Sequence, residues 1–456
     1  MPKSDPLTLM THSIGELGSR LVQGTLSAER LAGACLDRIA EQNASVNAFI
    51  TVFDKEAREQ ARTADREIRS GAYRGPLHGI PISLKDLIDV EGTPTTAASR
   101  LRAGHLARAD AAVVTRLRDA GAIIVGKCNL HEFAFGTTSD ESAFGPVRHP
   151  ADLTRSPGGS SGGSAVAVAT GMSCASIGTD TGGSIRIPAA ACGVVGLKPT
   201  FGELSCAGVV PLARSLDHVG PLARSVADAW LVYNAMRGTS APPPPALSAS
   251  GLRLAIPRPY FLDLLDRAVS DRFDEAVGRL RRAGVSIGEV SIPHAREAAP
   301  VYLHTSLAEA WTYHATALER APGAYSPGVR RRLELGRYVL AEDYVRAQQG
   351  RDVLRAEVDN ALADADALVL PTLAIPAPPI GASTVKVGTG DQPVRAMMLR
   401  LTQLFNLTGH PAISLPCGAA DGGLPCGVQL VGRRHGTGDL LRVALASERH
   451  ITPSER

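Results

Sequence analysis

Two clusters of glycine and serine, at residues 158–164 and 182–184, constrain this chain more than any other feature of its sequence. A short apolar segment and a strand-like run separate the two clusters. Glycine has no Cβ, so paired glycines before a serine leave backbone N–H groups bare and allow a partner to approach closely. Such a loop binds an anion, or it stabilises an oxyanion while the serine attacks a carbonyl. The clusters therefore predict a functional loop for which the remaining chain is scaffold.

Helical and strand-like patterns alternate along the chain. A helical pattern at residues 112–120 precedes the apolar run 122–125, and the same succession recurs at 163–178 and at 270–292. Residues 79–90 alternate in a strand-like way, with a proline that interrupts the pattern. Repeated alternation of this kind favours an α/β fold with a central mixed, largely parallel sheet that helices cover on both sides.

Helix-capping signals and the glycine-serine clusters divide the first half of the chain into two regions. A capping box at Ser13 and an N-cap at Ser27 predict a helical N-terminal region, which we place at residues 1–75. Residues 76–222 contain the glycine-serine clusters and form the expected core.

Two later segments have a different character. The proline run within residues 241–250 predicts a surface segment, because consecutive prolines are stiff and extended; a domain boundary is the other interpretation. Residues 298–364 are helical in pattern and rich in aromatic side chains. They predict either a lid over the substrate or ordinary core packing.

The composition excludes several classes of protein. A net charge of +3 over 456 residues gives no electrostatic footprint for nucleic acid or an anionic membrane. No apolar run is long enough to span a bilayer, and the first residues lack the pattern of a signal peptide. The seven cysteines are scattered and never spaced as Cys-x-x-Cys, which argues against a disulfide framework and a zinc site. We therefore expect a cytoplasmic protein.

Several familiar motifs fail in this sequence. No lysine completes a nucleotide-binding P-loop at the clusters, and the His131-Glu132 pair lacks the second histidine of a zinc motif. Residues 158–162 match Gly-x-Ser-x-Gly, but that elbow must follow a strand directly, and residues 152–157 are polar and broken by proline. A flexible linker does not explain the interleaved alanines and valines.

A different constellation joins Lys85, Ser160 and Ser184. A serine hydroxyl is a weak nucleophile and needs a base, and a lysine can serve if burial depresses its pKa so that a neutral amine exists. A second serine between them would relay the proton. The backbone N–H groups of residues 181–184 could then point at a developing oxyanion.

At these residues the chain resembles the amidase signature family. The resemblance rests on residues 157–164, 178–188 and 193–200, together with the upstream lysine segment 79–86. It is dense from residue 79 to residue 222 and looser in two C-terminal segments, 406–413 and 424–430. It implies a single amidase signature domain over residues 1–456, with no metal and no organic cofactor.

The resemblance also implies a role for each site residue. Ser184 would be the acylating nucleophile, Ser160 the bridging serine held by a cis peptide bond, and Lys85 the base. The oxyanion and substrate-binding positions would be Thr181, Gly182, Gly183, Phe133, Ala134 and Phe135. The residues that brace the loop would be Ser161, Asp180 and Arg186.

These roles predict a hydrolase that cleaves the C–N bond of a small-molecule amide through an acyl-enzyme. Because no charge cluster lies near the motifs, we expect a neutral substrate: an aryl amide, an ester or a carbamate (urethane). We expect a monomer or homodimer. The alternative is the glutaminase-type A subunit of a tRNA-dependent amidotransferase, working with partner subunits, which residues 127–133 and 142–145 also resemble. A non-catalytic binding protein is a third hypothesis.

Overall fold

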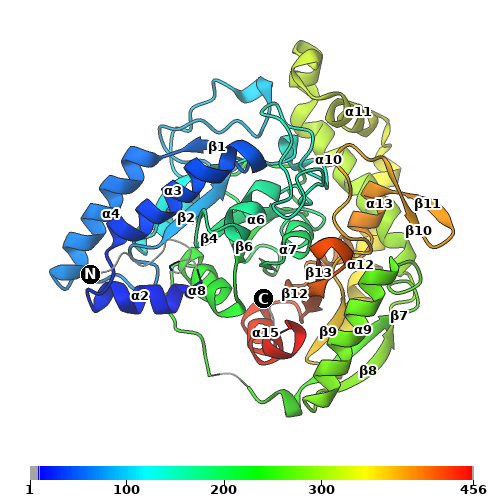
Figure 1. Ribbon diagram of the computed structural model, residues 1–456. Coiled ribbons are helices and arrows are strands. Elements are labelled where there is room, and N and C mark those ends of the chain that lie inside the picture. The colour runs from blue at the N-terminus through cyan, green and yellow to red at the C-terminus, as the bar shows by residue number, and fades with distance from the viewer. Residues whose placement is uncertain (1–8, 10, 246, 454–456) are drawn as a thin grey trace.

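The computed structural model describes residues 9, 11–245 and 247–453 (Figure 1). An 11-stranded mixed sheet runs through the molecule in the order β1-β3-β2-β4-β6-β5-β12-β13-β9-β7-β8. Its strands are β1 (Phe49–Val52), β2 (Pro81–Lys85), β3 (Ile123–Cys128), β4 (Ala175–Asp180), β5 (Val195–Lys198), β6 (His218–Ala223), β7 (Arg253–Arg258), β8 (Ser286–Ser291), β9 (Ala367–Pro371), β12 (Ala412–Ala419) and β13 (Pro425–Val431).

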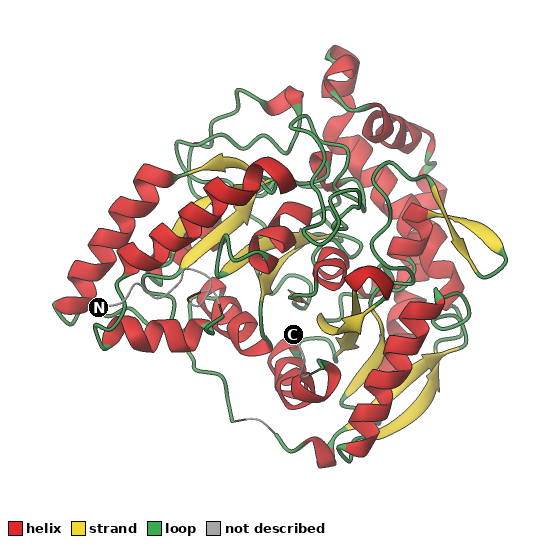
Figure 2. Cartoon of the chain, in the orientation of Figure 1, coloured by secondary structure: helices red, strands yellow, loops and turns green. Residues whose placement is uncertain are grey.

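Helices cover both sides of this sheet, as the sequence predicts (Figure 2). They are α2 (Ile14–Val22), α3 (Ala28–Val46), α4 (Asp54–Arg69), α5 (Ala112–Asp119), α6 (Gly162–Ala169), α7 (Arg186–Cys192), α8 (Val226–Met236), α9 (Arg267–Arg282), α10 (Ala298–Arg320), α11 (Pro327–Leu335), α12 (Ala341–Ala361), α13 (Val394–Leu399), α14 (Leu404–Leu407) and α15 (Thr437–Ile451). A small hairpin of β10 (Thr384–Val387) and β11 (Gly390–Pro393) lies apart from the main sheet.

The sheet is mixed, but it has fewer parallel pairs than the sequence predicts. Parallel pairing occurs in two blocks, β3-β2-β4 and β9-β7-β8. The strands between these blocks pair antiparallel, as do β1 and β3. The reason is visible at β12 and β13, where a short turn at residues 420–424 allows only an antiparallel pair.

Local sequence signals set several element boundaries. Ser13 and Glu16 form the predicted capping box of α2, and the Ser27 side chain accepts from the backbone N–H of Arg30 at the start of α3. The sequence predicts that Pro81 interrupts a strand, but Pro81 is instead the first residue of β2. At the first position of a strand, the N–H that proline lacks is not needed for the hydrogen bonds of the sheet. The strand ends at Lys85, because the chain turns there with the Leu87 N–H donating to the Lys85 carbonyl.

The later segments take the following positions. Residues 237–245 lead away from α8 along the outside of the molecule, and the Trp230 indole donates to the Ala241 carbonyl at 3.1 Å (Figure 1). Helices α10, α11 and α12 pack together beside α13 (Figure 1).

No disulfide joins any of the seven cysteines, all of which lie in the described part of the chain. Among the described residues, no helix has the length and apolar character required to cross a membrane.

The sheet centre should dominate stability. Leu222, in β6, is fully buried, so Leu222→Ala should lower the free energy of unfolding by about 2–5 kcal/mol through lost burial and the cavity left behind. Leu335→Ala is the matched control, because Leu335 is 56% exposed and its loss should change that free energy by less than about 0.5 kcal/mol. Urea denaturation followed by circular dichroism measures both. Equal effects of the two changes would contradict this placement of the core.

Candidate active site

Lys85 lies at the carboxyl end of β2, inside the parallel block of the sheet. Its side chain is fully buried, and its Nζ donates to Ser160 Oγ at 2.8 Å and to Thr179 Oγ1 at 2.7 Å. Burial lowers the Lys85 pKa to about 7, against the attraction of the Asp180 and Asp217 carboxylates. A neutral amine, able to accept a proton, is therefore well populated near neutral pH.

Ser160 stands at the entry to α6. The peptide bond between Gly159 and Ser160 is cis, as the resemblance implies. The Ser160 carbonyl accepts from the His131 N–H and from Ser139 Oγ, each at 3.2 Å, and Ser139 Oγ in turn accepts from the Gly162 N–H. These bonds fix the backbone of the loop, so the Ser160 hydroxyl is held toward Lys85.

Ser184 lies just before α7, with 6% of its surface exposed. The Ser161 N–H donates to the Ser184 carbonyl at 3.2 Å, and Ser161 Oγ donates to the Thr179 carbonyl at 3.2 Å. The structure thus joins the two glycine-serine clusters, which lie apart in the sequence, through Ser161 and the end of β4.

The loop before Ser184 is clamped on both sides. Thr181 Oγ1 donates to Asp217 Oδ1 at 2.6 Å, and Thr402 Oγ1 donates to the Gly182 carbonyl at 2.6 Å. A Cβ on Gly182 would lie 2.6 Å from the Tyr302 hydroxyl. Gly183 has a φ of +139°, and a Cβ there would overlap Thr402. Only glycine fits at these two positions, which keeps the backbone N–H groups uncovered.

Asp180 and Arg186 form the buried base of this loop. The Asp180 carboxylate accepts from Arg186 Nε at 3.0 Å, from Arg186 Nη2 at 3.1 Å and from the Ile185 N–H at 3.2 Å. Burial alone would raise the Asp180 pKa, but the guanidinium of Arg186 and the ammonium of Lys198 hold it well below its usual range. Asn406 donates to both the carbonyl and the carboxylate of Asp180. A fixed ion pair therefore ties the loop to the segment before β12.

A cavity of about 330 Å³ opens beside these groups. Thr179 and Thr181 contribute from the end of β4, and Ala134 contributes from the short helical turn at residues 132–134. Most of the remaining wall comes from residues 206–219. Among these, Asp217 is half-buried, and its partial removal from water raises its pKa to about 6 despite the hydrogen bonds from Thr181 and the backbone of Leu212 and Ala213.

The structure separates the three residues expected to line the acyl side. Ala134 lines the cavity. Phe133 packs against His314 and Tyr325, with ring centroids 4.4 and 5.5 Å away. Phe135 lies beneath two guanidinium groups, those of Arg332 and Arg395.

Sequence reasoning missed several residues that contact the loop. Thr179 is the second acceptor of Lys85, Asp217 and Thr402 clamp the loop, and Tyr302 closes on Gly182. Thr179 falls within the segment 178–188 that carries the resemblance, so its position was available as a signal. The other three lie well outside that segment, and no local pattern marks them.

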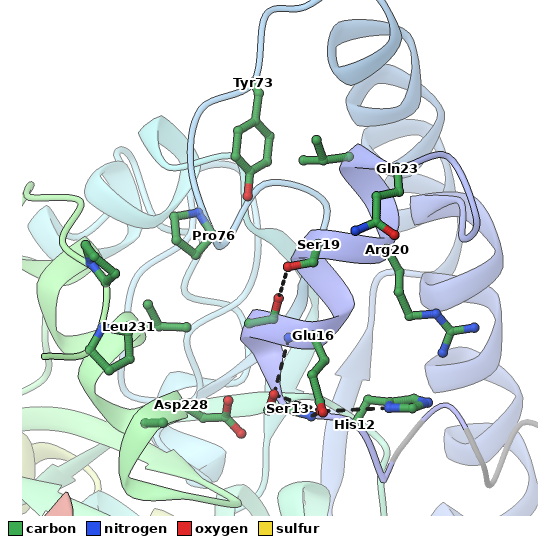
Figure 3. A pocket seen from close by; sticks show the side chains of 15 residues that line it. His12, Ser13, Glu16, Ser19, Arg20, Gln23, Tyr73, Pro76, Asp228 and Leu231 are labelled. Atoms are coloured by element: carbon green, nitrogen blue, oxygen red, sulfur yellow. Dashed lines mark hydrogen bonds and ion pairs between the residues drawn. The ribbon is translucent and has the colours of Figure 1, made fainter. Parts of the chain in front are cut away.

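A larger groove of about 870 Å³ lies elsewhere, between α2, α8 and the proline-rich segment (Figure 3). Its polar groups already serve the helix ends: Ser13 and Glu16 cap α2, and Asp228 accepts from the Ile14 N–H at 2.7 Å. Its lining includes none of the residues next to Lys85, Ser160 and Ser184, whereas Thr179 and Thr181 line the smaller cavity, so we place the candidate active site there. In the described residues, no group of three or more histidine, cysteine or acidic side chains could hold a metal ion.

The fold and these residues define the class of the protein. The family profile described as Amidase matches residues 30–441. The chain therefore belongs to the amidase signature family, whose hydrolases act on C–N bonds.

Individual relatives are similar over nearly the whole chain. The A subunit of glutamyl-tRNA(Gln) amidotransferase from Chloroflexus aggregans is 40% identical over 466 residues, covering 94% of each chain. A crystal structure of an amidase superposes with a TM-score of 0.91 at 38% identity, covering 96% of this chain and 100% of that one. The corresponding A subunit from Thermotoga maritima superposes with a TM-score of 0.78 at 34% identity, covering 97% of each.

The Lys85 amine should titrate near neutrality. The chain has six lysines, so selective labelling of lysine side chains should give a simple NMR spectrum. We expect one signal to change with a midpoint at about pH 7, being protonated below and neutral above, and to disappear in Lys85→Met. Because the Asp217 carboxylate raises the Lys85 pKa, Asp217→Asn should lower that midpoint. A midpoint near the ordinary lysine value of 10.5 would contradict the burial described for this amine.

Proposed function

We propose that this chain hydrolyses the C–N bond of a carboxamide through an acyl-enzyme on Ser184. The observation that carries the proposal is the 2.8 Å hydrogen bond between Lys85 Nζ and Ser160 Oγ, formed by an amine whose pKa is about 7. A hydroxyl nucleophile requires such a base close by. The hydrogen bond from the Ser161 N–H to the Ser184 carbonyl joins the two glycine-serine clusters. The second cluster supplies the nucleophilic hydroxyl, that of Ser184.

The proposed reaction has two halves. Neutral Lys85 accepts the Ser160 proton as Ser160 accepts that of Ser184, and Ser184 Oγ bonds to the substrate carbonyl carbon. The loop of Thr181, Gly182 and Gly183 offers its N–H groups to the oxyanion, and protonated Lys85 returns its proton through Ser160 to the leaving nitrogen as the C–N bond breaks. Water then attacks the acyl-enzyme by the same relay and releases the acid and Ser184.

Within this chemistry, the relatives support a glutaminase-type amidotransferase component better than an enzyme for aryl amides or carbamates. They include A subunits of glutamyl-tRNA(Gln) amidotransferase at 40% identity over 94% of each chain. We propose that the chain releases ammonia from glutamine or a similar primary amide, in company with partner subunits. A stand-alone amidase is the second candidate, because the superposition on an amidase is better than that on the amidotransferase component.

Ser184→Ala should abolish turnover, with a loss of at least roughly 10⁴-fold, because no acyl-enzyme can form. Labelling by a fluorophosphonate probe should disappear in the same variant. Ser164→Ala is the matched control, since Ser164 is also buried, in the neighbouring helix α6, but outside the proposed relay. The control should keep activity and labelling within about threefold. Retained turnover in Ser184→Ala, with mass spectrometry confirming the substitution, would overturn the assignment.

A substrate panel separates the two candidates. The purified chain is assayed for ammonia from glutamine and for aniline from small anilides, with product identification. The glutaminase-type proposal predicts release from glutamine that partner subunits of an amidotransferase increase, and little release from anilides. Rapid anilide hydrolysis with no action on glutamine, alone or with those subunits, would establish the stand-alone amidase instead.

A further inference from the structure

A serine in the cavity wall is held at each of its polar atoms by two charged side chains. The Ser215 N–H donates to Glu309 Oε2 at 2.9 Å, and the Ser215 hydroxyl donates to Glu309 Oε1 at 2.5 Å. Arg351 donates from Nη1 to the same hydroxyl and from Nη2 to the Ser215 carbonyl, each at 3.0 Å. Hydrogen bonds with an ionised partner are stronger than neutral ones. We call these three residues the Ser215 cluster, and it fixes this point of the wall.

The Ser215 cluster lies two residues from a carboxylate that holds the proposed oxyanion loop, residues 181–183. The Asp217 N–H donates to the Ala213 carbonyl at 2.9 Å, which closes a tight turn around Ser215. The Asp217 carboxylate accepts from backbone N–H groups of this turn and from Thr181 Oγ1 at 2.6 Å. A shift of Ser215 would therefore move the Asp217 carboxylate, and with it the start of the loop.

The charged members of the cluster come from the aromatic-rich region 298–364. Glu309 is in α10 and Arg351 is in α12, and these two helices pack together. Each side chain has a further partner that fixes it: Glu309 accepts from the Tyr344 hydroxyl at 3.0 Å, and Arg351 donates to the Leu407 carbonyl at 3.1 Å. Apolar side chains would suffice if the helices only packed against the wall, because removing charges from water is costly. The charges indicate that the exact position of the wall matters.

We infer that Glu309 and Arg351 are positioning residues for the proposed reaction. Acting through Ser215, they set the distance of the Asp217 carboxylate from the oxyanion loop and from Lys85. Neither of the two lines the cavity itself. The inference rests on the proposed acyl-enzyme chemistry, and it gives the helices α10 and α12 a role besides that of a lid or of ordinary core packing.

The first test removes one hydroxyl and no charge. Ser215→Ala deletes the hydroxyl that bonds to both Glu309 and Arg351. The rate at which a fluorophosphonate labels Ser184 is measured at several probe concentrations, which separates the maximal rate from the half-saturating concentration. The maximal rate should fall by roughly tenfold, less than for loss of an oxyanion donor itself, with half-saturation unchanged within about twofold. Ser205→Ala, which removes an exposed hydroxyl just before the same wall, should change neither value.

A second measurement distinguishes positioning from a merely structural role. The Lys85 midpoint, followed by NMR of labelled lysines, should fall by roughly half a pH unit in Ser215→Ala, because the Asp217 carboxylate that attracts the ammonium is displaced. A merely structural role would lower the thermal stability and leave this midpoint in place. Circular dichroism shows that each variant is folded.

A second variant tests whether Glu309 acts through Ser215. Glu309→Gln replaces one of the acceptor oxygens of the cluster by an amide nitrogen, and it should also lower the maximal labelling rate. The double variant Ser215→Ala/Glu309→Gln should lose less than the product of the two single fold-losses, because both changes act on one path.

An unchanged Lys85 midpoint in Ser215→Ala, whatever the labelling rate, would overturn the inference. An unchanged maximal rate, or fully multiplicative losses in the double variant, would also overturn it. If the fluorophosphonate does not label the unmodified chain, the proposed acyl-enzyme fails, and the Lys85 midpoint alone decides the role of the cluster. A midpoint that falls in Ser215→Ala but not in Ser205→Ala then supports the inference, and equal midpoints in all three proteins refute it.

Discussion

The candidate active site depends on one buried amine, that of Lys85, whose hydrogen-bond partners among the described residues are hydroxyls rather than a carboxylate. Lys127 shows the ordinary arrangement for such a side chain, with its ammonium 2.9 Å from Asp86. Lys85, equally buried, donates to two hydroxyls among the described residues, and the carboxylates that attract it, Asp180 and Asp217, act from further away. Desolvation therefore outweighs attraction, and the pKa falls to about 7. Pairing Lys85 directly with a carboxylate would hold the proton on the amine.

The sheet converts this local chemistry into a fixed geometry. β2 and β4 are neighbours in a parallel block, so Lys85 and Thr179 emerge at the same edge. The first glycine-serine cluster runs into α6 and the second leads into α7, and the Asp180–Arg186 pair ties the second cluster to distant C-terminal residues. Groups held on packed strands and helices stay in place better than groups on free loops. Residues 206–219, which form most of the cavity wall, therefore face groups that the sheet and helices hold in place.

Family membership and substrate depend on different parts of the chain. The similarity to amidases and amidotransferase subunits extends over nearly the whole chain, so it does not by itself distinguish one substrate from another. Substrate preference must come from the surroundings, which here include α10, α11 and α13. These helices place Tyr302 against Gly182 and the guanidinium groups of Arg332 and Arg395 over the Phe135 ring. A fold with common chemistry can therefore select its substrate through charges that lie far from the motifs.

The sequence by itself determined the α/β class, the capping of the first helices and the residues of the loops, because glycine, serine and periodic apolar positions act locally. It pointed to Lys85, Ser160 and Ser184 through a resemblance, but not to the hydrogen bond that joins the first two. Only the tertiary structure decided the largely antiparallel centre of the sheet, the clamps from Asp217 and Thr402, and the position of Arg395, which has no counter-ion among the described residues. These features depend on which distant segments become neighbours, and that is settled by packing of the whole chain rather than by any local pattern.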